Sequence, residues 1–264
     1  MIRRPPRSTP SNSSAASDVY KRQTHDPAAS AGRLEPIIKE LKAYNYEFVT
    51  PEPATEADIL RAHTARHLEE VKREPIVYEM ALLAAGGAIK AAHLAYEGTP
   101  TFAVIRPPGH HASSDSCWGF CYFNNISVSL LNLREYKGIK SAFILDFDLH
   151  TGDGNINILR EKQHVIQTEI LNPHSNTEQE YLEEIAETFQ RVGPFDIITA
   201  SAGFDEYEKD WGGKLSTNAY TQIGKLMKDF SEEKCHGRRY ALLEGGYYHP
   251  DLGKNVYAFC QGFE

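Results

Sequence analysis

Cysteine is scarce in this sequence, and its few copies are poorly placed for a structural role. The 264 residues include four cysteines, Cys117, Cys121, Cys235 and Cys260. A disulfide framework is typical of much shorter secreted chains, and the spacing does not form the paired pattern of a structural zinc site. We therefore expect reduced thiols in a cytoplasmic protein, and we assign Cys121 no catalytic role.

Long apolar runs and an excess of basic residues are also missing. No stretch approaches the roughly 18 consecutive apolar residues of a membrane span, so we expect no membrane association. The formal net charge of −8 argues against direct nucleic-acid binding and mildly favours cationic or neutral substrates. The composition carries no signal for an oligomeric state.

The N-terminal segment lacks the apolar centre of a secretory signal. Residues 1–23 are dominated by Ser, Pro and Arg, and residues 11–23 resemble translated adapter sequence rather than native protein. We expect residues 1–23 to be disordered and the opening strand of the domain to be missing. Residues 24–264 have the length of one large α/β domain, and the chain's 41% apolar content is enough for a core.

Strand-like and helical segments alternate through most of the chain. Apolar runs predict strands at Thr101–Ile105, Ser141–Phe147, His164–Ile170, Phe195–Ser201 and Arg239–Leu243. Periodic segments predict helices at Ile76–Tyr96, Tyr122–Tyr136, Thr177–Val192, Ser216–Lys234 and Asp251–Gly262. Such alternation implies a mostly parallel sheet covered on both faces, with ligands bound at the carboxyl ends of its strands.

Earlier in the chain, local signals predict shorter helices. Thr55–Asp58 has the pattern of a capping box and predicts a helix that continues to His63. His63 and His67 lie four residues apart, a spacing common to surface pairs. We read Gly86–Gly87, inside the long Ala-rich helix, as a site of close packing against a sheet.

One stretch places acidic residues and a histidine at the end of a predicted strand. The apolar run Phe143–Leu145 is followed by Asp146, Asp148 and His150 on alternate positions before a glycine-flanked turn. Alternate side chains on a strand share a face, so these three project to the same side. A carboxylate and a neutral imidazole two residues apart can bind one divalent cation. The alternative for this stretch alone is a polar strand end with solvated acids.

Three other predicted strands also lead into glycine and chemically active side chains. The segments that follow them are Arg106–His111, Ala202–Asp205 and Glu244–Tyr247. Any one of these exits is ordinary turn chemistry. Because all of them are expected at one edge of a parallel sheet, the set indicates a functional site.

The motifs of this chain resemble, in order, those of the zinc-dependent histone deacetylase family, including its bacterial and archaeal acetylpolyamine amidohydrolase relatives. They are Arg106–His111, Gly119–Asn125, Asp146–Gly154, Ser201–Asp205 and Glu244–Tyr247, within a resemblance that runs from about Arg33 to the C-terminus. The resemblance implies the arginase/deacetylase fold, a three-layer α/β/α domain with a mostly parallel sheet. It also implies a hydrolase that removes acetyl groups from acetylated lysine, with an acetylpolyamine as the alternative substrate.

The resemblance further implies a role for each site residue. The implied metal ligands are Asp148, His150 and Asp205, the implied catalytic residues are His110, His111, Asp146, Asp153 and Tyr247, and the implied channel residues are Gly119 and Phe120. Three protein ligands leave positions for water and a carbonyl oxygen, as in a catalytic site. Zn²⁺ is the default ion, Fe²⁺ also suits two carboxylates and one imidazole, and the resemblance allows a structural monovalent cation as well.

Two segments depart from the family pattern. Thr151 stands where many members have a second histidine, and we expect little effect on the chemistry. Residues 171–176 lack the Phe-Pro-Gly-rich loop that walls the channel in many eukaryotic members, so the pattern does not predict that wall.

Two other classes of protein share part of this pattern. An arginase-like ureohydrolase has the same fold but needs further carboxylates near the third ligand, and Glu206–Asp210 does not reproduce their spacing. A non-catalytic acyl-lysine-binding module needs neither a proton shuttle nor the Tyr247 hydroxyl. Between substrates, we favour acetyl-lysine in proteins or peptides, because no added acidic segment marks a dedicated polyamine site.

Overall fold

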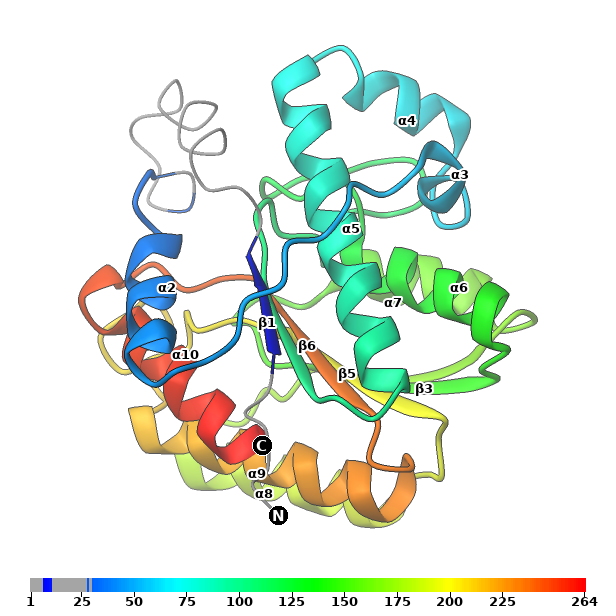
Figure 1. Cartoon of the computed structure of the whole chain (residues 1–264). Helices are drawn as coiled ribbons and strands as arrows, with labels where there is room; N and C mark the ends of the chain where they lie inside the picture. The colour runs from blue at the N-terminus through cyan, green and yellow to red at the C-terminus, as the bar shows by residue number, and fades with distance from the viewer. Residues whose placement is uncertain (1–6, 11–27, 29) are drawn as a thin grey trace.

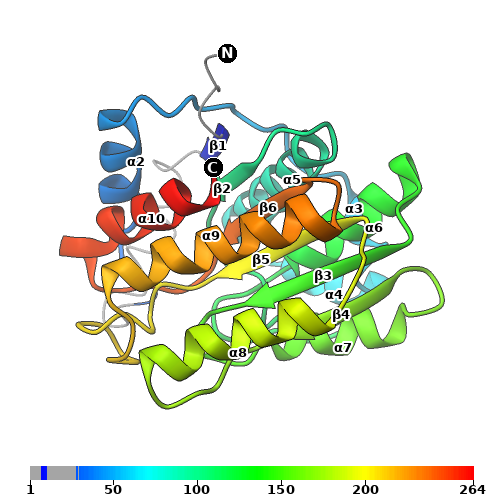
Figure 2. The ribbon, with the colours of Figure 1, turned by 90° about the horizontal axis from the view of Figure 1, so that it is seen from below.

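Parallel strands form one continuous sheet in this protein. Residues 7–10, 28 and 30–264 are described by the structure, a computed structural model. The strand order is β1-β2-β6-β5-β3-β4, and every neighbouring pair is parallel (Figure 1 and Figure 2). The strands are β1 (Arg7–Pro10), β2 (Thr101–Val104), β3 (Ser141–Asp146), β4 (Gln167–Leu171), β5 (Ile197–Ala202) and β6 (Arg239–Leu243). The prediction of a mostly parallel sheet is confirmed.

Helices cover both faces of this sheet and complete the three-layer arrangement. One face packs against α2 (Leu34–Ala43), α8 (Glu178–Arg191), α9 (Thr217–Lys234) and α10 (His249–Phe263). The other packs against α3 (Glu56–Ile59), α4 (Ala65–Val71), α5 (Pro75–Tyr96), α6 (Asn125–Lys137) and α7 (Asp153–Glu161). Figure 2 shows α8 and α9 in front of the sheet and α5 behind it.

The side chains of β3 alternate between the two cores. Phe143 and Leu145 join the core beneath α8 and α9, whereas Ile144 joins the core beneath α5 and α6. A strand buried on both faces reads as a continuous apolar run, which is what the sequence shows. Phe147 also joins the α8–α9 core, so Asp146, one residue before it, points toward the opposite face.

The path of the chain makes a switch point at the carboxyl ends of the strands. From β3 the chain passes through α7 to the edge strand β4 and then returns through α8 to β5 on the other side of β3. Because α7 and α9 pack on opposite faces, the segments that leave β3 and β5 diverge. Such a switch point is where open parallel sheets bind ligands.

The long helix α5 lies in the interior. Among the described residues it alone has the length and apolar composition of a membrane span, and more than half of its most apolar stretch is buried inside the protein. Gly86 packs differently from our expectation. A Cβ there would lie 1.9 Å from the carbonyl oxygen of Glu52, so the glycine admits the backbone of residues 52–54 rather than the sheet.

The N-terminal strand differs from the sequence expectation. We expected disorder throughout residues 1–23 and no opening strand, but Arg7–Pro10 pairs in parallel with Thr101–Val104. The free edge of β2 offers unpaired backbone groups, and an edge strand can pair with them regardless of its side chains and can tolerate proline. The rest of that segment lies outside the described residues.

Two helices near the site also differ from the predicted pattern. The capping box of Thr55 and Asp58 is present, but α3 ends at Ile59 rather than continuing to His63. We predicted no helix between the expected strands Ser141–Phe147 and His164–Ile170, but α7 (Asp153–Glu161) begins within the glycine-flanked turn. Its glycine lowers helix propensity, but Asp153 in the first turn favours a helix start, and buried Ile158 and Leu159 anchor the helix to the core.

Candidate metal and catalytic site

Two carboxylates and one imidazole meet where β3 and β5 end. Asp148, His150 and Asp205 each place a ligand atom within 4.8 Å of the others. Asp148 and Asp205 are buried, while His150 is partly exposed. The structure therefore brings together the three residues that the sequence assigned to a metal, in a group that is closed toward the core and open on the imidazole side.

The hydrogen bonds of this group leave room for a cation. Asp148 Oδ2 accepts the N–H of Gly245 at 2.8 Å, and Asp205 Oδ1 accepts the N–H of Leu149 at 3.0 Å. Asp205 Oδ2 is buried without a hydrogen-bond partner among the described residues, although His150 Nδ1 lies 3.5 Å away. A buried, unsatisfied carboxylate oxygen beside a second carboxylate is costly unless a positive charge faces it. The donor set thus fits a divalent metal ion.

Among the protein groups, the protonated imidazole of His150 provides the positive charge that faces the two carboxylates. The nearby carboxylates of Asp148, 3.3 Å from Nδ1, and of Asp205, 3.5 Å from Nδ1, raise its pKa to about 10. Burial and the charge of Asp148 raise the pKa of Asp205 to about 7. Metal ligands must be deprotonated, so a bound cation would take the place of these protons.

Glycine is required at the strand exits because the carboxylates occupy the space of a side chain. A Cβ on Gly245 would lie 2.4 Å from Asp205 Oδ2 and 2.5 Å from Asp148 Oδ2. A Cβ on Gly203 would lie 2.3 Å from Asp148 Oδ2. The recurrence of glycine after these strands therefore reflects the packing of the site and not turn geometry alone.

The first histidine of the tandem pair lies deep in the site. His110 Nδ1 is 3.3 Å from Asp146 Oδ2, and His110 Nε2 is 3.7 Å from Asp148 Oδ1. Burial opposes the charged imidazole, but the charges of Asp148 and Asp146 outweigh it and raise the pKa of His110 well above its usual value. His110 is therefore suited to contribute a fixed positive charge.

The second histidine has the opposite electrostatic character. His111 Nδ1 is 2.6 Å from Asp153 Oδ1. Burial and the neighbouring charge of His110 lower the pKa of His111 to about 4. A neutral imidazole oriented by a carboxylate can accept a proton at neutral pH, which is what a general base requires.

Tyr247 closes the site from the β6 side. Its backbone N–H donates to Asp210 Oδ2 at 2.6 Å, and its ring lies 4.2 Å from the ring of Trp211. Burial, followed by the charges of Asp148 and Asp205, raises the pKa of Tyr247. The phenol thus stays protonated and can donate a hydrogen bond.

The two residues assigned to the channel lie on the loop that faces His111. A Cβ on Gly119 would lie 2.8 Å from His111 Cδ2, so the loop backbone runs directly against the imidazole. Phe120 is partly buried and has a left-handed backbone, with φ of 61°. The structure brings this loop to the site, and the channel role of the two residues stays a prediction.

Sequence reasoning missed several residues of the site. Trp211 is 51% exposed, and its ring centroid lies 6.2 Å from that of His150. Trp118 contacts both His111 and Asp153. Fully buried Arg33 donates Nε to the carbonyl of Gly246 at 2.7 Å and fixes the approach to Tyr247. The two exposed tryptophans were the available sequence signal, whereas a lone arginine offers none.

A second group of possible ligands lies behind the tandem histidines. It consists of buried His110, Cys121 and Glu244. Glu244 Oε2 accepts the N–H groups of Gly109 at 2.7 Å and His110 at 3.2 Å. Burial raises the pKa of the Cys121 thiol well above its usual value, so the sulfur stays protonated. This group shapes the loop that carries the histidines.

Thr151, which departs from the family pattern, should have little effect on the reaction. Its side chain is exposed, and its carbonyl accepts the N–H of Asp153 at 2.8 Å, a bond that any residue can make. We expect Thr151→His to leave kcat/KM within about twofold of wild type, because surface substitutions of this kind change free energies by only about 0.5 kcal/mol. A tenfold change in steady-state kcat/KM would contradict this.

Comparisons with known proteins identify the family to which this chain belongs. The family model described as the histone deacetylase domain matches residues 27–181 and 169–263. This chain belongs to the histone deacetylase domain family. It is 27% identical to a protein named "Probable deacetylase" of Methanothermobacter thermautotrophicus, over 94% of this chain and 88% of that protein. It is 31% identical to a "Probable deacetylase" of Archaeoglobus fulgidus, over 75% of this chain and 68% of that protein.

A solved structure agrees on the fold. The crystal structure of the HDA15 HD domain superposes with a TM-score of 0.84 at 19% identity, covering 99% of this chain and 90% of that one. The arginase/deacetylase fold and the family expected from the motifs are thereby confirmed. Family membership supports a hydrolase with deacetylase function, and the described residues include a candidate metal site of the kind that such enzymes use.

Proposed function

We propose that this protein is a metal-dependent deacetylase that removes the acetyl group from acetyl-lysine in peptides or proteins. The observation that carries the proposal is one constellation at the carboxyl ends of the strands. It combines the Asp148–His150–Asp205 group with the His110–Asp146 pair, the His111–Asp153 pair and Tyr247. We propose Zn²⁺ as the metal, and Fe²⁺ is the alternative for the same donor set.

The residues divide the chemistry of amide hydrolysis among them. Asp148, His150 and Asp205 would hold the cation, which would supply a Lewis acid to polarise the acetyl carbonyl and acidify the attacking water. His111, oriented by Asp153, accepts a proton from the water at Nε2 and later delivers a proton to the leaving amine. The low pKa of His111, set by burial and by His110, leaves this nitrogen free at neutral pH.

Two further groups respond to charge that develops during the reaction. The Tyr247 hydroxyl donates a hydrogen bond to the carbonyl oxygen as it becomes an oxyanion. His110, 3.3 Å from Asp146 Oδ2, contributes positive charge beside the same region. Neither group needs to move a proton, because each is preorganised in the state that its role requires.

The charge of the protein bears on the choice of substrate. The acidic chain, with a net charge of −8, suits an acetylated cation, which is either a lysine side chain or a polyamine. We favour acetyl-lysine because the sequence shows no added acidic segment that marks a dedicated polyamine site. Acetylpolyamine hydrolysis is the alternative outcome of the test.

The deciding experiment compares kcat/KM for an acetyl-lysine peptide, acetylspermidine and acetylputrescine on the full chain. The full chain is used because Arg7–Pro10 contributes β1 to the sheet. We expect the peptide to be hydrolysed most efficiently. A kcat/KM for the acetylpolyamines that is about tenfold or more higher would show that they, and not acetyl-lysine, are the substrate.

The same assay separates the other protein classes. Absence of turnover for all three substrates in a metal-loaded protein would indicate a binding module. Release of urea from arginine would indicate a ureohydrolase. Metal content, measured on the same preparation, shows whether an inactive sample simply lacks its ion.

A further inference from the structure

We propose that Trp118 is a positioning residue that holds Asp153 and His111 in their hydrogen-bonded arrangement, an inference that rests on the proposed deacetylase function. The indole Nε1–H of Trp118 donates to Asp153 Oδ2 at 3.0 Å. The indole also stacks on the imidazole of His111, with ring centroids 3.6 Å apart and planes inclined by 29°. Trp118 therefore contacts both members of the pair.

The indole completes the restraint of His111. The imidazole has two ring neighbours, since the His110 centroid is 4.0 Å away and the Trp118 centroid is 3.6 Å away. Its Nδ1 is fixed by Asp153 at 2.6 Å. Loss of the indole would expose one face of the ring and allow it to rotate away from the orientation that proton transfer needs.

Asp153 depends on the same contact. One carboxylate oxygen faces His111 and the other faces Trp118, so the group is held at both ends. The Asp153 side chain is 42% exposed, and without the indole its Oδ2 would bond to mobile water. A carboxylate free to rotate orients its histidine less well than one with two fixed donors.

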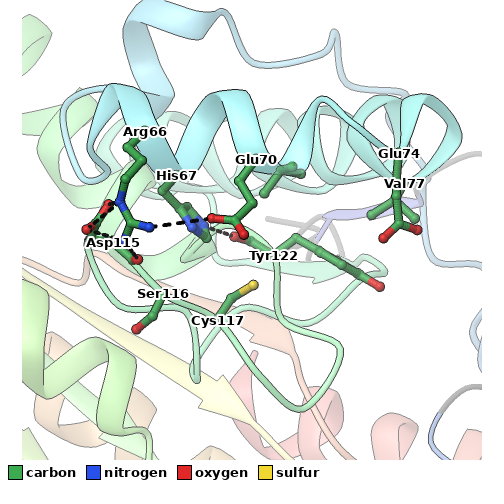
Figure 3. A pocket seen from close by; sticks show the side chains of 10 residues that line it. Arg66, His67, Glu70, Glu74, Val77, Asp115, Ser116, Cys117 and Tyr122 are labelled. Carbon is green, nitrogen blue, oxygen red and sulfur yellow. Dashed lines mark hydrogen bonds and ion pairs between the residues drawn. The ribbon is translucent and has the colours of Figure 1, made fainter.

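The loop that carries Trp118 is fixed at both of its ends by α4. Arg66 donates Nε to Asp115 Oδ2 at 2.9 Å and Nη2 to the Asp115 carbonyl at 2.8 Å (Figure 3). His67 Nε2 lies 2.7 Å from the Tyr122 carbonyl. Between these anchors, Cys117 borders a pocket of about 360 Å³. The two ends of the loop are therefore fixed, and between them Trp118 contacts the catalytic pair.

Burial alone does not account for this side chain. Trp118 remains 54% exposed, so it contributes little to the core, yet its polar and aromatic parts both have specific partners. Removal of the indole should therefore alter the geometry of the site without unfolding the protein. This property makes the proposal testable by substitution.

The kinetic test uses Trp118→Ala and Trp118→Phe with an acetyl-lysine peptide. We expect Trp118→Ala to lower kcat by about 10- to 100-fold while KM changes by less than about threefold, because geometry and not substrate binding is lost. Trp118→Phe keeps a stacking ring and should fall between that variant and wild type. Tyr136→Ala, which removes an aromatic side chain that is 63% exposed on α6, is the matched control and should retain wild-type kcat.

A double-mutant cycle identifies the partner. If Trp118 acts by orienting His111, His111→Ala combined with Trp118→Ala should be no slower than His111→Ala alone. If Trp118 were instead a wall of the substrate channel, Trp118→Ala would raise KM, and its effect would add to that of His111→Ala. Additive effects, or wild-type kcat in Trp118→Ala, would overturn the proposal.

A readout independent of turnover separates this inference from the proposed function. The chain has two tryptophans, so Trp118→Phe assigns the two indole N–H signals in an NMR spectrum of the ¹⁵N-labelled protein. We expect Asp153→Ala to shift the Trp118 signal and to leave the Trp211 signal in place. An unshifted Trp118 signal overturns the inference even in an active enzyme. If the Trp118 signal shifts but the protein has no deacetylase activity, the proposed function is contradicted, and the Trp118–Asp153 contact is still established.

Discussion

Replacement of Asp148 and Asp205 by alanine is expected to abolish metal binding and deacetylation together. The wild-type protein should bind about one catalytic divalent ion per chain. The double variant keeps only His150 of the three candidate ligands, and one partly exposed imidazole is a weak site. Loss of the Lewis acid should lower kcat/KM by at least about 10³-fold, since such an ion contributes several kcal/mol to transition-state stabilisation.

Metal analysis of purified protein, paired with the acetyl-lysine assay, provides the measurement. Glu69→Ala combined with Glu97→Ala is a matched control, because it removes two carboxylates of side chains that are 67% and 59% exposed. The control should keep the wild-type metal content and activity. The same metal stoichiometry in the Asp148/Asp205 variant and in the wild type would refute the ligand assignment.

Tyr247→Phe is expected to lower kcat by about 10²–10³ with metal content and fold unchanged, because it removes one hydrogen-bond donor to the oxyanion. The ring of Phe can still pack 4.2 Å from Trp211 and beneath Arg33, whose guanidinium lies 5.2 Å from the ring centroid. The backbone bond to Asp210 is also retained. The substitution therefore isolates the hydroxyl.

Tyr257→Phe provides the comparison for this variant. Tyr257 stacks on Tyr44 on the α2–α10 surface, with ring centroids 3.7 Å apart, and takes no part in the site. It should retain wild-type kcat and melting temperature. Near-wild-type turnover of Tyr247→Phe would show instead that this tyrosine has a packing role only.

Much of the site could be predicted from sequence because its residues stand at fixed places relative to regular elements. Asp146, Asp148 and His150 follow an apolar strand, and alternation along that strand determines which side chains share a face. The alternation of strands and helices likewise requires parallel strands, whose carboxyl ends meet at one edge. Local pattern and chain topology were enough to place Asp205 near Asp148.

Other features were decided only when distant segments packed together. The charge states of His110 and His111 depend on which carboxylates surround each ring in the folded protein, and the sequence gives the two adjacent residues no different context. Gly86 accommodates the backbone of residues 52–54, which is far from it in the chain. These properties follow from three-dimensional proximity and burial.

The sequence by itself determined the parallel α/β architecture, the family and the residues that gather at the strand ends, because periodicity and motif order are local properties. Tertiary structure decided that Arg7–Pro10 adds a strand to the sheet, since backbone pairing at an open edge needs no particular side chains. It also decided that Trp118 and Trp211 flank the site. Each is an exposed aromatic residue in a loop, and only the packing of that loop against His111 or Tyr247 distinguishes it from a surface side chain.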